Sequence, residues 1–195
     1  MRRSVISGTL WGGSDEQHAS GSLRSALWRL PRLDLIRTSP THIWLSPAVE
    51  VDLRRVIEEA RGLLRGLAST STLDEVARDL IDVGDDILLG WYEDWVQIER
   101  EQFRQIRLQA LDRIAEQLLE AGSLFAAFQV ALAATRTEPL RESSQRLLVR
   151  VHLTRGNVAE ALHQYWRFTT LLRSEVDGRP SPMFEGLIAP YLRRL

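Results

Sequence analysis

The sequence predicts a mainly α-helical protein, in which an array of helical hairpins follows a short N-terminal segment that contains a β-hairpin. After Pro47, apolar residues recur at the three- and four-residue spacing of amphipathic helices. Gly122 and Gly156 lie 34 residues apart and separate helices of similar pattern. Before Pro47, two β-prone runs flank a short polar stretch that contains a proline.

The composition is that of an ordinary soluble globular protein, with 44% hydrophobic and 26% charged residues. No apolar run reaches the roughly 18 residues that a transmembrane helix needs, and the N-terminus lacks the pattern of a signal peptide. The chain has no Cys, which excludes disulfides and Cys-ligated zinc. These features predict a cytoplasmic protein that does not enter a membrane.

The charge is divided unevenly along the chain. Residues 1–47 carry six Arg against three acidic residues, a net charge of +3. The remainder carries 19 Arg against 23 acidic residues, a net charge of −4. A mildly basic first part and an acidic second part fit a nucleic-acid-binding module joined to a protein-interaction module.

Two helices and a β-hairpin are predicted before Pro47. Residues 1–12 have apolar positions that fit one helix. Residues 15–30 form an amphipathic helix that Pro31 ends. The hairpin is expected over residues 33–46, with its turn at Thr38-Ser39-Pro40-Thr41. The apolar face of the second helix carries Leu23, Leu27 and Leu30.

Everything after Pro47 is predicted to be helical. Thr72 can cap one helix at its start, residues 82–86 form a loop, and Gly122 closes a long helix that begins near Trp91 or Glu93. Pro139, Gly156, Gly178 and Pro180 separate the later helices. The expected helices cover residues 50–67, 73–82, 91–121, 123–136, 140–155, 157–177 and 182–194.

One alignment of the chain with itself identifies the repeat. When Gly122 is placed over Gly156, Ala127 falls on Ala161 in the second helix of each unit. The Gly permits a tight turn between two helices, and the Ala leaves room for their close approach. We therefore predict a tetratricopeptide-like array with two full hairpins, at residues 102–139 and 140–173. A generic helical bundle with coincident glycines is the alternative. Such arrays bind peptides or helices and rarely do chemistry.

The helical half resembles the bacterial transcriptional activator domain of the SARP group, the Streptomyces antibiotic regulatory proteins. The resemblance runs from about residue 49 to residue 195 and follows the order and spacing of the family. The motifs that match the family include Leu89-Gly-Trp-Tyr-Glu-Asp-Trp-Val, Leu108-x-Ala-Leu-Asp-Arg-Ile-Ala-Glu-Gln-Leu, Glu138-Pro-Leu-Arg-Glu-Ser-Ser-Gln-Arg-Leu-Leu, Gly156-Asn-x-Ala-Glu-Ala-Leu-x-Gln-Tyr and Pro180-Ser-Pro.

That family places a winged-helix DNA-binding domain before the activator module. Leu10-Trp11-Gly12 is similar to the end of its first helix, residues 19–30 to its recognition helix, and residues 33–46 to its wing. The resemblance therefore implies two domains. Residues 1–47 would be a partial winged-helix segment, and residues 48–195 the tetratricopeptide-like activator domain.

The resemblance also implies which residues contact DNA. On the helix they lie opposite the leucines, where Arg side chains can reach phosphates or take a guanine edge bidentately. A solvated basic face is the alternative for the Arg residues, and packing on the wing is the alternative for the Trp. The candidates are Ser22, Arg24, Ser25, Trp28, Arg29 and Arg32 on the helix, with Arg37 and His42 on the hairpin.

The chain departs from the family in two ways. Only nine residues precede Leu10, so the N-terminal sheet of the family is not expected, and the wing would lack its usual support. The apolar underside of residues 23–30 would then pack elsewhere. Pro31 stands where the family usually has Arg, which shortens the helix and removes a charge. A start further upstream, a fragment, or a weakened or lost DNA contact would each explain these departures.

Candidate partner-binding residues on the helical array are Trp91, Trp95, Arg141 and Trp166. Trp91 and Trp95 are expected one helical turn apart, a spacing that suits an interaction hot spot. Core packing between the linker and the first repeat is the alternative for this pair, and Trp166 leaves the same choice open.

The sequence offers no pattern typical of catalysis or cofactor binding. No pair among the four His residues has metal-ligand spacing, and the acidic residues of 82–86 lack the order of a calcium loop. No phosphate-binding loop follows the N-terminal glycines, and no Ser or Thr lies in a nucleophile-elbow context. We expect neither an enzyme nor a cofactor.

Two functions follow from these observations. The first is a transcriptional regulator which, as the resemblance implies, binds direct repeats near a promoter as a homodimer and recruits RNA polymerase through its helical module. The second is a protein–protein adaptor, or a truncated or degenerate regulator without DNA binding. In-frame DNA upstream of Met1 discriminates between them, because sheet-coding sequence there supports the first and a nearby stop codon supports the second.

Overall fold

The computed structural model describes residues 1–30, 34–67, 73–84 and 87–192. The chain divides into two compact units, Met1–Asp52 and Leu53–Leu195, which are treated separately. Pro31, Arg32 and the expected cap at Thr72 lie outside the described residues. Within them, no helix is both long and apolar enough to cross a membrane.

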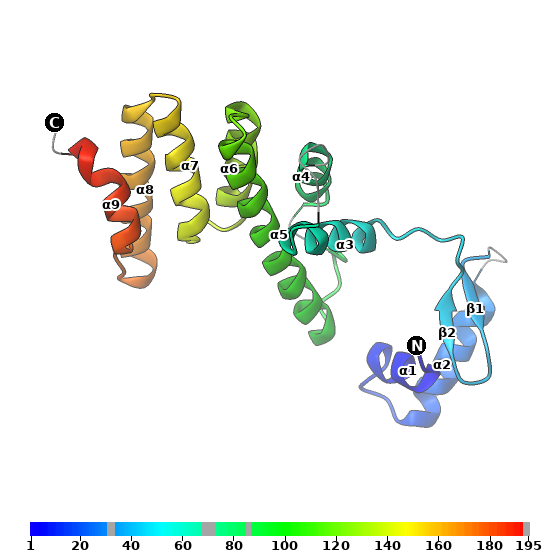
Figure 1. Ribbon diagram of the computed structural model, residues 1–195. Helices are drawn as coiled ribbons and strands as arrows, with labels where there is room; N and C mark the ends of the chain where they lie inside the picture. The colour runs from blue at the N-terminus through cyan, green and yellow to red at the C-terminus, as the bar shows by residue number, and fades with distance from the viewer. Residues whose placement is uncertain (31–33, 68–72, 85–86, 193–195) are drawn as a thin grey trace. The chain divides into compact units, whose positions relative to one another are not determined.

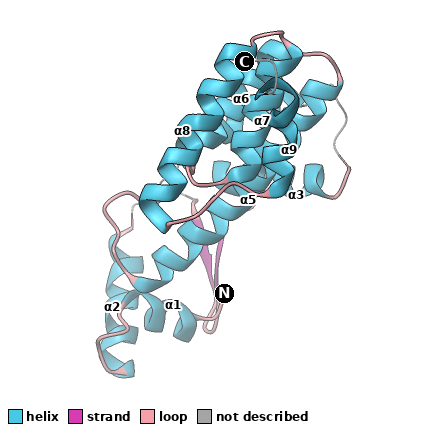
Figure 2. Ribbon diagram, turned by 90° about the vertical axis from the view of Figure 1, so that its left-hand side faces the viewer, coloured by secondary structure: helices cyan, strands magenta, loops and turns pink. Residues whose placement is uncertain are grey.

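The first unit contains two helices and one hairpin. Helix α1 spans Arg3–Leu10 and α2 spans Glu16–Arg29. Strands β1 (Ile36–Thr38) and β2 (Ile43–Leu45) pair antiparallel, and all other regular structure described in the chain is helical (Figure 2). The helix expected over residues 15–30 and the hairpin expected over 33–46 are thereby confirmed.

The hairpin has a support that the sequence did not predict. We expected it to lack its usual support, because only nine residues precede Leu10. Instead the backbone of the first three residues pairs with Thr41, His42 and Ile43, at the start of β2 and just before it. The N–H of Ile43 donates to the Met1 carbonyl at 2.9 Å, and the N–H of Arg3 donates to the Thr41 carbonyl at 2.9 Å.

The apolar underside of α2 is only partly buried. Leu23 is buried and Leu27 is half-buried, whereas Leu30 is 43% exposed. Leu30 differs because α2 ends at Arg29 and the backbone of Leu30 is already extended, with ψ 134°. Burial of the predicted leucine face therefore decreases toward the end of α2.

From α4 onward, the helices of the second unit form an array in which each contacts its neighbours in sequence (Figure 1). Helix α5 packs against α6, α6 against α7, and α7 against α8, while α5 also contacts α7. This order confirms the tetratricopeptide-like array. Its helices are α3 (Asp52–Leu64), α4 (Leu73–Asp82), α5 (Asp94–Glu120), α6 (Leu124–Thr137), α7 (Glu142–Thr154), α8 (Val158–Val176) and α9 (Pro182–Leu192).

Both predicted repeat glycines adopt the left-handed conformation that a tight helix end requires. Gly122 has φ +76°, its N–H donates to the Leu119 carbonyl, and the next N–H, from Ser123, donates to the Leu118 carbonyl. The same two bonds close α7 at Gly156, where φ is +75°. These paired bonds satisfy the carbonyls that a helix end leaves free.

A third helix end uses the same geometry. Gly66 has φ +75° at the end of α3, and the N–H of Leu67 donates to the Gly62 carbonyl at 2.9 Å. Gly66 does not lie 34 residues before Gly122, so the sequence alignment did not reveal it. Helix α3 therefore ends as the regular repeats do, although its spacing to the next unit differs.

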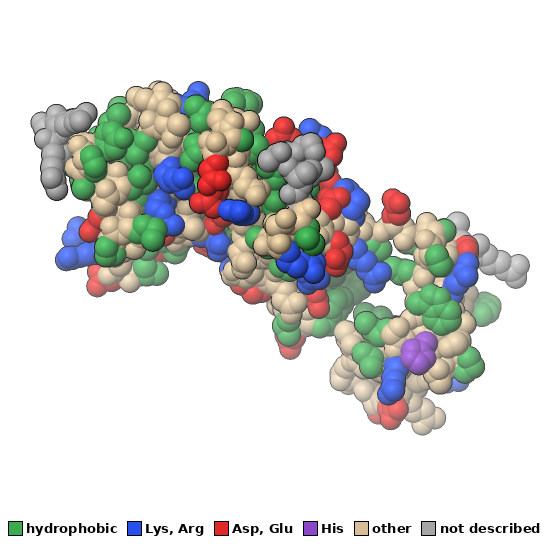
Figure 3. Space-filling model, viewed as in Figure 1, with side chains coloured by type: hydrophobic (Ala, Val, Ile, Leu, Met, Phe, Trp, Pro, Cys, Tyr) green, Lys and Arg blue, Asp and Glu red, His purple; other side chains and the backbone are tan. Residues whose placement is uncertain are grey.

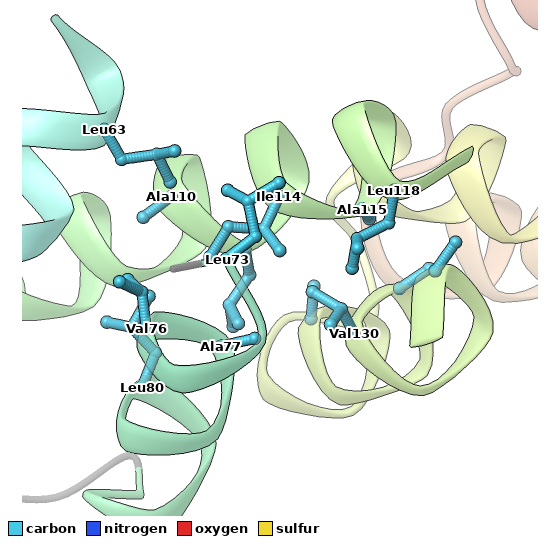
Figure 4. Packing of buried hydrophobic residues seen from close by; sticks show 14 of the residues in the cluster. Leu63, Leu73, Val76, Ala77, Leu80, Ala110, Ile114, Ala115, Leu118 and Val130 are labelled. Carbon is cyan, nitrogen blue, oxygen red and sulfur yellow. The ribbon is translucent and has the colours of Figure 1, made fainter. Parts of the chain in front are cut away.

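The core of the array is continuous from α3 to α7. Figure 4 shows leucines, isoleucine, valines and alanines from α3, α4, α5 and α6 meeting at its centre. Ala127 and Ala161 are fully buried, as close approach of paired helices requires. A second cluster joins α7, α8 and α9, where the ring centroid of Phe184 lies 5.2 Å from that of Tyr165 and 5.6 Å from that of Phe168.

Polar contacts also tie consecutive helices together. Arg107 on α5 is only 4% exposed, and it donates to the Leu80 carbonyl at 2.6 Å and to the Thr137 hydroxyl at 2.8 Å. Those acceptors lie near the C-terminal ends of α4 and α6, where a cation is favourable. Asp112, also on α5, accepts bonds from the Ser143 and Ser144 hydroxyls at the start of α7.

Candidate DNA-binding and partner-binding surfaces

The residues predicted to contact DNA on α2 gather on its exposed side. Arg24, Ser25 and Arg29 are exposed, and Ser22 is half-buried beside them. All four line an open groove of about 750 Å³. Arg24 and Arg29 form no ion pair with any residue that the structure describes. Both guanidinium groups are therefore available to an anionic ligand. Arg32, the remaining helix candidate, lies outside the described residues.

Trp28 lies on the same side of α2 and is 87% exposed. Packing of this ring on the hairpin, which was the alternative for it, is not observed. An indole ring exposed to this extent contributes little to the stability of its own unit. It is instead a large apolar surface that a ligand can cover.

The start of α2 carries a negative charge. Asp15 caps the helix by accepting the backbone N–H of His18 at 2.9 Å, and the His18 ring nitrogen Nδ1 lies 2.7 Å from the same carboxylate. These hydrogen bonds, the backbone one first, hold the pKa of Asp15 below its ordinary value. The carboxylate therefore stays ionised near neutral pH, and phosphate contacts are expected further along α2, at the two Arg residues.

The hairpin presents a second set of basic groups. Arg37 and His42 are exposed, but Arg37 lies 3.6 Å from Asp34, so its charge is partly offset. Arg3 donates to the Ser39 carbonyl at 3.0 Å, which brings its guanidinium to the hairpin turn. The backbone of Arg2 forms a bridge with His42. Sequence reasoning missed Arg2 and Arg3, because only the pairing of the N-terminus with β2 places them here.

The first two aromatic candidates of the array, Trp91 and Trp95, contact each other edge to face with ring centroids 6.0 Å apart. They do not lie one helical turn apart, because α5 begins only at Asp94. Positive φ angles at Leu88 (57°) and Gly90 (82°) form a turn that stops the helix from beginning earlier. Trp95 is half-buried with a buried indole N–H, which fits the core-packing alternative, whereas Trp91 is 42% exposed.

Arg141 and Trp166 differ in how they are engaged. The Nε of Arg141 lies 2.9 Å from the Asp112 carboxylate, so its charge holds the start of α7 against α5. Trp166 on α8 is 50% exposed and lines a cavity of about 690 Å³ together with Arg167 and Leu171. Of these two candidates, only Trp166 presents a free surface.

Charge alone does not single out one face of the helical array. On the face drawn in Figure 3, Arg and acidic side chains are interspersed over the helices, with hydrophobic side chains between them. Among the residues that the structure describes, no three His, Asp or Glu side chains are grouped as metal ligands.

Comparisons with known proteins agree with the helical array. Residues 51–189 match the family described as the bacterial transcriptional activator domain. The chain is 27% identical over 197 residues to the regulatory protein AfsR of Streptomyces coelicolor, an alignment that covers 91% of this chain and 19% of AfsR. The chain thus spans less than a quarter of that relative.

A solved structure shows the same fold. The chain is similar over its whole length to Mycobacterium tuberculosis EmbR, determined in complex with a low-affinity phosphopeptide. The TM-score is 0.65, the sequence identity is 19%, and the match covers 55% of the EmbR chain. At this identity the likeness concerns the fold alone.

Proposed function

Because the chain belongs to the bacterial transcriptional activator domain family, we propose that it is a SARP-type transcriptional regulator that binds promoter DNA. Residues 1–47 act as a partial winged helix, with α2 and the β1–β2 hairpin on the DNA. The helical array contacts RNA polymerase or a partner subunit. The protein binds direct repeats as a homodimer. Light scattering of the protein with and without DNA tests this oligomeric state.

The exposed basic side of α2 carries this proposal. Arg24, Ser25, Trp28 and Arg29 follow the i, i+1, i+4, i+5 spacing of one helical face. Two guanidinium groups without ion pairs in the described chain can bind phosphates or a guanine edge. The adjoining serines can donate to phosphate oxygens, and Trp28 can cover the sugar.

The basic groups of the hairpin support the same surface. The hairpin itself carries Arg37 and His42. The backbone pairing of the N-terminus brings Arg2 and Arg3 beside them. A wing that carries several cations suits the phosphate backbone of an adjacent groove. Asp34 weakens this part, because it already pairs with Arg37. We therefore place most of the DNA affinity on α2.

The salt dependence of binding tests the proposal. A fluorescent random-sequence duplex of about 30 base pairs is titrated with the full chain at several salt concentrations. The double variant Arg24→Ala/Arg29→Ala is expected to weaken binding and to reduce the slope of log K against log salt by about 2, since two phosphate contacts are lost. Arg179→Ala, at an exposed Arg of the array, is the matched control and leaves the slope unchanged.

The outcome of that titration also bears on a second candidate, an adaptor that does not bind DNA. Exposed apolar side chains in the first unit favour it: Leu30, Leu35 and Trp44 are each more than 40% exposed. Such side chains suit a protein partner better than a phosphate backbone. If the double Arg variant still binds the duplex in a salt-sensitive way, the assignment of DNA contacts to α2 is wrong. If the folded chain binds no duplex at low salt, the adaptor is the function that remains.

A further inference from the structure

Two adjoining cavities open along α8, with volumes of about 380 and 690 Å³. They share Pro139, Arg167 and Leu171, so they lie side by side on α8. We call the two cavities together the α6–α8 groove; their described lining includes Leu132 on α6, Pro139 in the following loop and Ser174 on α8. An extended segment of polypeptide can occupy both cavities at once.

A fixed polar network forms part of the groove lining. Gln145 is only 4% exposed; its side-chain amide donates to the Pro139 carbonyl at 2.7 Å and accepts from the Gln164 amide at 2.5 Å. The network holds the loop after α6 against α7 and α8. A lining fixed in this way needs little reordering when a ligand binds.

The described lining of the groove carries positive charge and no acidic side chain. Arg136 and Arg167 are exposed and form no ion pair with the residues that the structure describes. None of the described lining residues of either cavity is Asp or Glu. Other Arg residues of the array pair with carboxylates, namely Arg104 with Glu138, Arg141 with Asp112 and Arg150 with Glu116. The groove therefore attracts an acidic ligand.

An apolar wall accompanies the two cations. Trp166 is 50% exposed, and Leu171, which lines both cavities, is half-buried. Trp and Arg are the side chains most enriched at the centres of protein interfaces. The phosphate backbone of a duplex would leave this wall uncovered, whereas a peptide can cover it with an apolar side chain. The lining thus favours a peptide over nucleic acid.

We propose that the α6–α8 groove binds an extended acidic segment of a partner protein. Its carboxylates pair with Arg136 and Arg167, and a bulky apolar side chain packs against Trp166. The inference deepens the partner-binding half of the proposed function and rests on it, but it does not require α2 to bind DNA.

A phage-displayed library of random peptides, about 12 residues long, is selected on the full chain. The enriched peptides are expected to combine Asp or Glu with Leu, Phe or Trp. By fluorescence anisotropy their affinity falls at least about tenfold in Arg136→Gln/Arg167→Gln and in Trp166→Ala. It is unchanged in the matched control Arg179→Gln. Because these side chains are exposed, circular dichroism is expected to show the same helicity and Tm for all variants.

Three outcomes overturn the inference: no enrichment, enrichment of basic or neutral peptides, or affinities that the groove variants do not change. Duplex DNA binding that depends on Arg136 and Arg167 overturns it as well. The variant Arg24→Ala/Arg29→Ala separates this result from the proposed function, because it is expected to bind the peptides normally. Loss of peptide binding and loss of DNA binding are thus read independently.

Discussion

At the scale of single residues, the glycines that end the repeat helices are required for their backbone conformation rather than for space. A Cβ added to Gly122 or Gly156 would meet no atom within 4 Å, yet φ is +76° at the first and +75° at the second. An L-residue pays a steric cost within its own backbone at such angles. Conformation alone therefore explains why these two positions carry glycine.

The glycine prediction follows from that distinction. Gly122→Ala and Gly156→Ala are each expected to lower the free energy of unfolding by roughly 1 kcal/mol. Gly186→Ala is the control, because Gly186 is exposed inside α9 and has no positive φ, so the change should stabilise the chain by about 0.5 kcal/mol. Urea unfolding followed by circular dichroism measures all three. Equal effects at the three sites would contradict the argument.

At the scale of helices, Arg107 is the contact that joins three of them. It lies on α5 and donates to groups near the C-terminal ends of α4 and α6. The side chain is buried, so its removal leaves the Leu80 carbonyl without that donor and away from water. Such a loss costs more than a surface ion pair does.

Arg107→Met is accordingly expected to lower the free energy of unfolding by about 2–3 kcal/mol. Arg113→Met, on the same helix, is the control. Arg113 is largely exposed and pairs with Glu116 at 3.3 Å, so its loss should cost less than about 1 kcal/mol. Urea denaturation with near-ultraviolet and far-ultraviolet circular dichroism compares them. If Arg107→Met is no more destabilising than Arg113→Met, the inter-helix role is wrong.

At the scale of the whole molecule, local sequence patterns predicted the helices and the β-hairpin, but they did not predict the contacts between residues far apart in the chain. Hydrophobic periodicity and two glycines were enough for the helices and for the hairpins of the array. The α2 surface was predictable too, because it lies opposite Leu23. The contact of Arg107 with Leu80 and the pairing of Met1 with Ile43 depend on tertiary packing. No spacing in the sequence indicates them.

The partly buried imidazole of His152 is expected to make stability depend on pH just below neutrality. The His152 ring on α7 lies edge to face with Phe128, 5.5 Å between centroids, and its Nδ1 is buried without a hydrogen-bond partner in the described chain. Burial lowers the pKa of His152 below 6.5; Glu160 opposes the change and Arg155 adds to it. The folded chain therefore takes up this proton less readily than the unfolded chain does.

The free energy of unfolding should consequently fall as pH drops through about 6.5, because the unfolded state then binds more protons than the folded state. Hydrogen bonds from Arg104 and Gln105 lower the pKa of Glu101 from 4.5 to about 2. The stability that Glu101 contributes is therefore lost only as pH falls below about 4.5, well below the range in which His152 takes up its proton. Urea unfolding at about pH 7.5 and 5.5 should show a smaller difference in His152→Gln than in the unaltered chain. An undiminished difference would assign the pH dependence to other groups.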